Sequence, residues 1–256
     1  MSFSAVITFL TSSATPTTAP ADIGIAAAYP GDKNIASDPA VIFADDFESY
    51  TSPDQAKAKW GRGGPLADMR IATEPEHVYS GAKAVEFSLP VSTTAEVAVS
   101  LYYFLSQPQD TVYMRMYQKF DANYSMKGSN HNGIRLSAKF ADISGVIPPA
   151  DGTGFFLFYL ENSFSAQPGE AVPGYTDIYA YWPKQRSQWG DHFYPDGTVI
   201  PWLPTIGTKG DWLAYPDQYP DFKPYPQFIP QRDRWYCYEL MVKANTPGKN
   251  DGEVKY

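Results

Sequence analysis

Two short stretches of the sequence carry side chains that can move protons. Asn130 and His131 are adjacent and shortly precede Arg135, while Tyr179 and Tyr181 are two positions apart. An imidazole or a phenol can act as a general base or acid, and a guanidinium or amide can neutralise a carboxylate. β-Elimination from a uronate needs these groups: a base for the proton beside the carboxylate, a neutralising group, and an acid for the leaving oxygen. We therefore name His131, Arg135, Tyr179, Tyr181 and Asn130 as candidate catalytic residues.

A glycoside hydrolase would need a different set of residues. Glycosidases place two carboxyl groups on either side of the bond that they cut. Jelly-roll glucanases of the family-16 type carry these groups on one strand as Glu-x-Asp-x-Glu. The nearest spacing in this chain is Glu74-Pro75-Glu76, whose proline is typical of a loop. The residues therefore favour elimination over hydrolysis.

Charge is distributed unevenly along the chain. The net charge is −8, which argues against nucleic acid or an anionic membrane as a partner. Between positions 111 and 141, however, five basic residues stand against one acidic residue, Asp121. The five are Arg115, Lys119, Lys127, Arg135 and Lys139. This local excess is suited to an acidic polysaccharide, although ordinary solvated strand faces would produce the same count.

The alternation of side chains predicts which of them face a ligand. In the strand expected over residues 111–120, Val112, Met114, Met116 and Phe120 face the core, and the intervening residues face the other way. Similar strands are expected over 134–140 and 175–182. If the three strands lie on one curved sheet, their polar faces line a groove. The candidate substrate-binding residues are Tyr113, Arg115, Tyr117, Lys119, Lys139, Trp189 and His192.

The elements that position these residues are predicted to be strands. Prolines, glycines and aromatic residues are abundant, charged residues make up 19%, and convincing helical periodicity is absent. The one helix candidate is Asp54–Trp60, a short turn after Ser52-Pro53. Further strands are expected over 69–73, 77–79, 82–89, 97–105, 154–160 and 235–243. This pattern indicates an all-β antiparallel sandwich of the jelly-roll type. Residues 189–232 form a long Pro- and aromatic-rich loop, which either stacks on sugar rings or packs as a lid on the sandwich.

The two ends of the chain differ in character. Residues 1–38 are interpreted as a leader, with a possible secretory signal and a linker, and residues 39–256 as the domain. At the other end, Asn250-Asp251-Gly252 predicts a tight hairpin turn between the strand 235–243 and a strand that begins at Glu253. We expect that second strand to be cut short at Tyr256.

A lone cysteine, Cys237, excludes an internal disulfide, and no segment is long enough to span a bilayer. We expect an extracellular or cell-surface protein.

Several motifs resemble those of the alginate/glucuronan-lyase-type polysaccharide lyases of family 14, which are concanavalin A-like jelly rolls. They are the strand Tyr113-Met-Arg-Met-Tyr-Gln-Lys-Phe-Asp121, the turn Lys127-Gly-Ser-Asn-His-Asn-Gly133, the Tyr179/Tyr181 pair and the hairpin 235–252. The resemblance covers roughly residues 41–256. It implies a polysaccharide lyase that acts on a uronate polymer and requires no cofactor.

The chain departs from that family at two points. The family's second turn lysine corresponds to Asn130, with His131 beside it, and its Ser-x-Arg strand has no counterpart. Either His131 and Arg135 have taken over the roles of base and neutralising group, or the chain is a non-catalytic, lectin-like or surface-structural domain. A loop histidine can equally be a surface residue, and paired tyrosines can be cross-strand aromatics.

A structural calcium ion is also possible. Asp45, Asp46, Glu48 and Asp251 offer the oxygen ligands that calcium prefers. The alternative is that these carboxylates only stabilise solvated turns. His77 is expected to make local hydrogen bonds.

Overall fold

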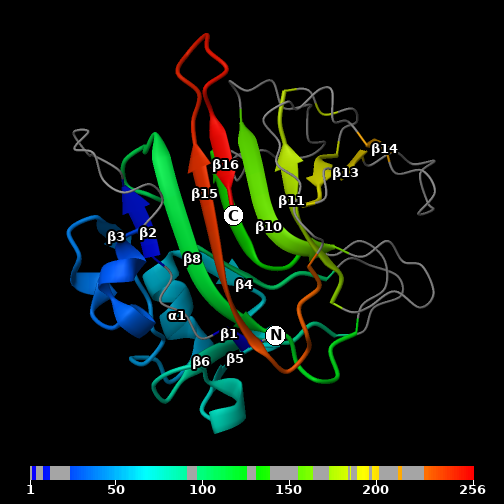
Figure 1. The fold of residues 1–256 in the computed structure, drawn as a ribbon. Coiled ribbons are helices and arrows are strands. Elements are labelled where there is room, and N and C mark those ends of the chain that lie inside the picture. Colours follow the sequence, from blue (N-terminus) through cyan, green and yellow to red (C-terminus); the bar gives the residue numbers. More distant parts are fainter. Residues whose placement is uncertain are drawn as a thin grey trace. The chain divides into compact units, whose positions relative to one another are not determined.

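The computed structural model describes residues 2–3, 8–11, 24–90, 97–125, 131–138, 155–163, 173–183, 185, 189–195, 198–201, 213–214 and 228–256. In these residues the chain is mostly antiparallel β-strand, with one α-helix and several 3-10 turns (Figure 1). The all-β class predicted from the sequence is therefore confirmed. The chain divides into two compact units: Met1–Lys119 together with Trp235–Tyr256, and Phe120–Arg234. No described helix has the length and hydrophobicity of a membrane-spanning segment.

The first unit contains most of the elements. Its strands are β1 (Ser2–Phe3), β2 (Thr8–Thr11), β3 (Val41–Phe43), β4 (Arg62–Gly64), β5 (Met69–Ala72), β6 (Ala84–Phe87), β7 (Ser100–Tyr102), β8 (Thr111–Lys119), β15 (Trp235–Lys243) and β16 (Glu253–Lys255). Its helices are α1 (Pro53–Trp60) and the 3-10 turns η1 (Ile25–Ala28), η2 (Pro30–Asp32), η3 (Ile35–Ser37), η4 (Leu66–Asp68) and η5 (Pro75–His77). Among the described strands, eight form one sheet in the order β16-β15-β8-β1-β6-β5, with β2 paired to β3 and β8, while β4 pairs with β7.

The centre of this sheet is the long pair β8–β15 (Figure 1). Every residue of β8 has a partner on β15, from Lys119 opposite Trp235 to Thr111 opposite Lys243. Val112, Met114, Met116 and Phe120 are buried as predicted. Tyr117 and Lys119, which were expected to face a ligand, are buried as well, so the simple alternation breaks down at the end of the strand.

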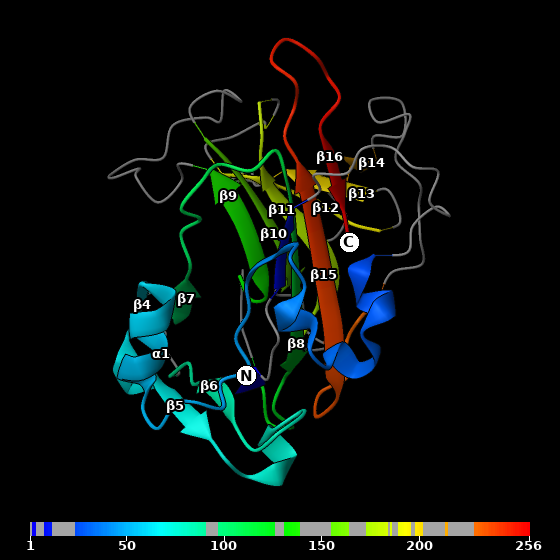
Figure 2. The same ribbon diagram turned by 90° about the vertical axis from the view of Figure 1, so that its left-hand side faces the viewer.

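Helix α1 begins at Pro53, one residue before the predicted Asp54, and ends at the predicted Trp60. Pro53 occupies the first turn, where its missing N–H costs nothing, and Gly61 ends the helix with a φ of 92°. Ala56 and Trp60, four positions apart, form its buried side. Trp60 packs edge-on against Phe43, with ring centroids 5.0 Å apart, and Figure 2 shows the helix beside β4.

Three expectations about the first unit need correction. Ordered turns begin at η1, before the expected start at Val41, and β1 and β2 lie within the expected leader and pair with β8. Residues 77–79 are not a strand, because Pro75 starts the 3-10 turn η5. In the β15–β16 hairpin the positive φ falls on Gly248 rather than on Gly252. The Asp251 carboxylate instead accepts hydrogen bonds from the backbone N–H and hydroxyl of Thr246.

The second unit is built on a single described sheet. Its strands are β9 (Ile134–Ala138), β10 (Phe156–Ser163), β11 (Tyr175–Tyr181), β12 (Asp191–Phe193), β13 (Thr198–Pro201) and β14 (Leu213–Ala214), in the spatial order β14-β13-β12-β11-β10-β9. All neighbouring pairs are antiparallel. The segment 189–232 was expected to lack secondary structure, but it supplies three strands of this sheet, β12, β13 and β14, and β14 forms the edge.

Candidate active site

One face of the six-stranded sheet carries a row of polar and aromatic side chains. Tyr159 on β10 lies opposite both Arg135 on β9 and Tyr179 on β11, and Tyr179 lies opposite His192 on β12. Directly opposed residues of antiparallel strands project to the same face. Three sequence-predicted residues, Arg135, Tyr179 and His192, are thus brought side by side by strand register, with Tyr159 between the first two.

His131 joins this face from the turn before β9. Its Nδ1 lies 2.8 Å from Oε2 of Glu161 on β10. The Glu161 side chain is fully buried, whereas the His131 side chain is 32% exposed. Because a carboxylate only accepts hydrogen bonds, it holds the proton on Nδ1 and leaves Nε2 able to accept one. This dyad has the arrangement of a general base with an orienting carboxylate.

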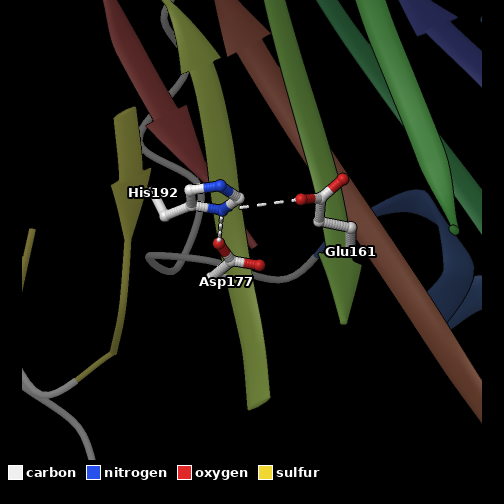
Figure 3. A group of neighbouring side chains, drawn as sticks. All are labelled: Glu161, Asp177 and His192. Carbon is white, nitrogen blue, oxygen red and sulfur yellow. Dashed lines mark hydrogen bonds and ion pairs between the residues drawn. The ribbon is translucent and has the colours of Figure 1, made fainter. Parts of the chain in front are cut away.

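A second histidine–carboxylate pair lies on the next strands. His192 Nδ1 is 2.6 Å from Asp177 Oδ2 and 3.6 Å from Glu161 Oε1 (Figure 3). Burial raises the pKa of Asp177 to about 7, against the opposing charge of His192. Burial works to lower the pKa of His192, but the charge and hydrogen bond of Asp177 outweigh it and raise that pKa. The two groups therefore hold a proton between them near neutral pH.

Tyr179 lies between the two histidines. Its ring centroid is 4.5 Å from that of His131 and 4.6 Å from that of His192. Its hydroxyl donates to the Tyr181 hydroxyl at 3.2 Å and accepts from the Gly190 N–H at 3.0 Å. Burial, together with the neighbouring Tyr181, raises the pKa of Tyr179 well above its usual value. A phenol with its pKa raised in this way stays protonated and is therefore unsuited to act as a base.

The tyrosine pair also belongs to an apolar cluster. Tyr179 and Tyr181 are both buried and pack with Phe155 and Leu157, and Trp189 packs against the same cluster. Trp189 is thus placed by the structure against the core of the second unit. This packing is the cross-strand role that the sequence also allowed for the two tyrosines.

Arg135 lies at the far end of the row. Its guanidinium carbon is 5.5 Å from the centroid of the Tyr159 ring, and the Tyr159 ring in turn stacks on His131 at 5.6 Å. A guanidinium at this distance from a ring makes a cation–π contact. Arg135 and His131 therefore contact the same tyrosine ring.

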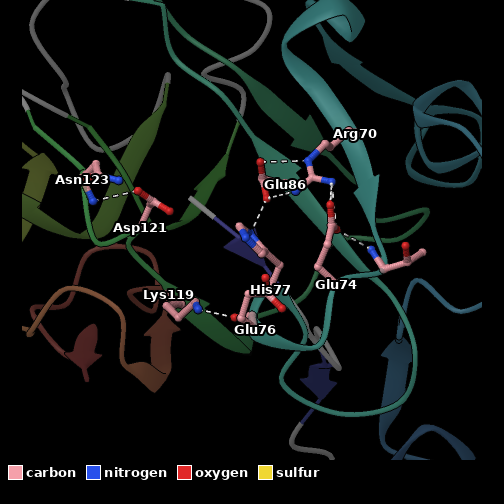
Figure 4. Close-up of polar contacts among 9 residues, drawn as sticks. Arg70, Glu74, Glu76, His77, Glu86, Lys119, Asp121 and Asn123 are labelled. Atoms are coloured by element: carbon pink, nitrogen blue, oxygen red, sulfur yellow. Dashed lines mark hydrogen bonds and ion pairs between the residues drawn. The ribbon is translucent and has the colours of Figure 1, made fainter.

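The candidates on β8 have internal partners. Arg115 pairs with Asp32 at 3.0 Å and with Glu239 at 3.4 Å, and donates to the Tyr117 hydroxyl. Lys119 is buried and donates to the main-chain carbonyl of Glu76 (Figure 4). These contacts explain why basic residues can lie on this strand without binding a ligand.

The condition for a groove lined by strands 111–120, 134–140 and 175–182, that the three share one sheet, is not met among the described residues. β8 belongs to the sheet of the first unit, whereas β9 and β11 belong to that of the second. Of the remaining candidates, Tyr113 lies on β8, and Asn130 and Lys139 fall outside the described residues. The candidate active site is therefore restricted to residues of the second unit.

The proposed calcium ligands make local hydrogen bonds. Asp45 is buried and its Oδ2 accepts from the Tyr50 hydroxyl and from the Trp60 indole. Glu48 accepts from two backbone N–H groups of the loop at Ala82. The calcium ion stays a prediction. The hydrogen bonds of Asp45 and Glu48 match the alternative, in which these carboxylates stabilise turns.

His77 also makes the local contact expected of it. Its Nδ1 lies 2.7 Å from Glu86, which also binds Arg70 (Figure 4).

Sequence reasoning missed the importance of Glu161 and Asp177. Their side chains are fully buried, and with His192 they form the group of potential metal ligands found among the described residues. A signal was present, because each carboxylate interrupts a strand of apolar and aromatic residues. An acidic residue inside a buried strand needs a partner, and that need marks it as structural or functional.

Comparison of the chain with family models, curated proteins and solved structures found no match. The site geometry is therefore the main basis for a functional proposal.

Proposed function

We propose that the chain is a polysaccharide lyase that cleaves an acidic, uronate-containing polymer by β-elimination. The observation that carries the proposal is the His131–Glu161 dyad, in which a partly exposed imidazole is oriented by a fully buried carboxylate at 2.8 Å. Arg135 and the Tyr179/Tyr181 pair lie on the same sheet face. Base, cation and acid thus come from one surface.

The proposed reaction uses each group once. His131 Nε2 takes the proton from the carbon beside the uronate carboxylate, and the electrons of that C–H bond form a carbon–carbon double bond. The bond from the adjacent carbon to the glycosidic oxygen breaks, and that oxygen takes a proton. Arg135 neutralises the carboxylate while negative charge builds up on it. Glu161 positions His131 and stabilises the imidazolium.

Tyr179, hydrogen-bonded to Tyr181, is the proposed acid. The raised pKa of Tyr179 keeps it protonated, which favours His131 over Tyr179 as the base. Both hydroxyls are buried, so the leaving oxygen must approach from the side of His131, whose ring contacts Tyr179.

A non-catalytic, lectin-like domain is the second candidate. It is favoured by the packing of Tyr179 and Tyr181 with Phe155 and Leu157, which gives both tyrosines a structural role. Such a domain would bind sugar through exposed groups of the same face and leave the polymer intact.

Elimination creates an unsaturated uronate, whose ultraviolet absorbance separates the two candidates. We expect the wild-type chain to generate this signal with alginate or glucuronan. His131→Ala should lower the rate by about 10² to 10⁴, the usual contribution of a general base. His77→Ala is the matched control, because His77 also pairs with a glutamate but lies in the first unit.

Polymer binding without an absorbance change, unaltered in His131→Ala, would establish the lectin. If His131→Ala cleaves the polymer at the wild-type rate, His131 is not the base.

The jelly-roll architecture and the cellular location belong to the same proposal. We propose that the antiparallel sheets belong to a concanavalin A-like sandwich and that the protein is secreted or displayed at the cell surface. Both follow from the family resemblance of the sequence and from the polymeric substrate.

A further inference from the structure

We propose that Glu161, Asp177 and His192 bind one divalent first-row transition-metal ion, with Zn²⁺ as the reference ion. The three side chains come from the adjacent strands β10, β11 and β12 and converge on one point (Figure 3). Each offers a ligand atom, and these atoms all lie within 4.8 Å of one another. The proposal is independent of the lyase activity.

Charge is the first argument. Glu161 and Asp177 are opposed on neighbouring strands, and neither side chain is exposed to solvent. Burying two carboxylates together is costly unless positive charge compensates them. A divalent cation compensates two carboxylates at once.

Open coordination positions are the second argument. Glu161 Oε1 and Asp177 Oδ1 are buried and have no hydrogen-bond partner among the described residues. Glu161 Oε1 is turned toward His192, 3.6 Å from Nδ1 (Figure 3). Buried carboxylate oxygens are ordinarily hydrogen-bonded, so an oxygen that faces the His192 imidazole without a hydrogen bond of its own has a lone pair free to coordinate an ion.

Spacing is the third argument. Ligands bound tetrahedrally at 2.0–2.2 Å are separated from one another by about 3.4 Å. The 3.6 Å between His192 Nδ1 and Glu161 Oε1 is close to that value. The 2.6 Å between His192 Nδ1 and Asp177 Oδ2 must widen by about 0.8 Å, a change that side-chain rotation can supply.

The ligand types select the class of ion. One imidazole and two carboxylates suit Zn²⁺ or Mn²⁺, whereas Ca²⁺ prefers six to eight oxygens. Coordination through Glu161 Oε1 leaves Oε2 in its hydrogen bond with His131. The metal site and the His131 dyad can therefore operate together.

The test is titration of the full chain with Zn²⁺ after chelator treatment, by calorimetry and by native mass spectrometry at about pH 7.5. We expect a one-to-one complex, weaker by at least about tenfold in Asp177→Asn and in His192→Gln. Ca²⁺ should bind at least about tenfold more weakly than Zn²⁺.

Two variants serve as controls. Asp45→Asn changes a buried carboxylate of the first unit, and His131→Ala removes the neighbouring imidazole that binds Glu161 Oε2. Asp45→Asn should bind Zn²⁺ within about threefold of the wild type, and His131→Ala should keep the one-to-one complex although losing a hydrogen bond to a ligand weakens it. Loss of elimination in His131→Ala with Zn²⁺ binding intact would separate the two proposals experimentally.

Absence of a one-to-one Zn²⁺ complex with the wild-type chain overturns the metal proposal, even if Asp177→Asn fails to fold. The metal proposal is also overturned if Asp177→Asn and His192→Gln both fold and bind Zn²⁺ as tightly as the wild type. The ion would then bind at another part of the surface.

Discussion

At the scale of single residues, buried carboxylates in this protein differ in how their oxygens are used. Asp45 binds the Tyr50 hydroxyl, the Trp60 indole, the backbone N–H of Phe47 and the Lys59 ammonium. Asp177 has one strong partner, His192, and one oxygen without a hydrogen bond among the described residues. A carboxylate with every oxygen bonded stabilises its loop, while one with spare acceptor capacity is available for chemistry.

The Asp177–His192 pair should make stability depend on pH. Both pKa values are raised in the folded protein, that of Asp177 to about 7. The folded state therefore holds these protons more tightly than the unfolded state, and their contribution to the free energy of unfolding is lost as pH rises through about 7. We expect the melting temperature of metal-free wild type to fall between about pH 5 and pH 8, and that of Asp177→Asn to fall less. Parallel curves for the two proteins would contradict this prediction.

At the scale of elements, the site depends on how β9 meets β10. Gly133 precedes β9 with a φ of 113°, and a Cβ at this position would collide with the main-chain carbonyl of Leu160. The absence of a side chain lets the turn approach β10 closely enough for His131 to reach Glu161. The His131–Glu161 dyad therefore depends on the turn at Gly133 as well as on its two side chains.

Replacing Gly133 by alanine should therefore affect both stability and activity. We expect Gly133→Ala to lower the free energy of unfolding by about 1–3 kcal/mol, because it adds backbone strain and a steric conflict. It should also reduce the elimination rate at least tenfold, as His131 is displaced. Gly248→Ala is the control: its φ is 79°, but the space around it is open, so a cost of about 1 kcal/mol and full activity are expected. Equal activities of the two variants would argue against the positioning role of the turn.

At the scale of the whole molecule, the second unit is an insertion in the first. The chain leaves the first unit after Lys119 and returns at Trp235, and these two residues are directly paired across β8 and β15. The backbone N–H of Asp233 donates to the carbonyl of Phe120 at 2.7 Å, which closes the base of the insertion. The pairing of β8 with β15 thus supplies the strand contact that fixes both ends of the inserted segment.

Removal of the insertion should prevent stable folding, because a sandwich of the proposed kind needs both sheets to bury one core. We expect a chain in which residues 120–234 are replaced by Asn-Gly to lack a cooperative unfolding transition, as followed by circular dichroism and by the fluorescence of Trp60 and Trp235. The Asn-Gly turn matches the twist of antiparallel strands, so the connection itself allows β8 to pair with β15. A cooperative transition in this protein would show that the first unit folds alone and would contradict the sandwich.

Much of the local structure was determined by the sequence. The alternation in 111–120 predicted β8, and the sequence also predicted a strand over 235–243 and a helix over Asp54–Trp60, because such signals arise from neighbouring residues. His131, Arg135, Tyr179 and His192 were likewise selected by their chemistry alone. The turn in the β15–β16 hairpin was misplaced because the Asp251 carboxylate binds Thr246, a contact that turn propensities do not include.

Only the tertiary structure decided which of these residues meet. Strand register brings Glu161 to His131 across 30 positions of sequence, and it places β8 in a different sheet from β9 and β11. A side-chain period of two specifies the face of each strand but not its neighbours. The partners of a buried carboxylate therefore depend on the order of strands in the sheet, and long-range packing sets that order.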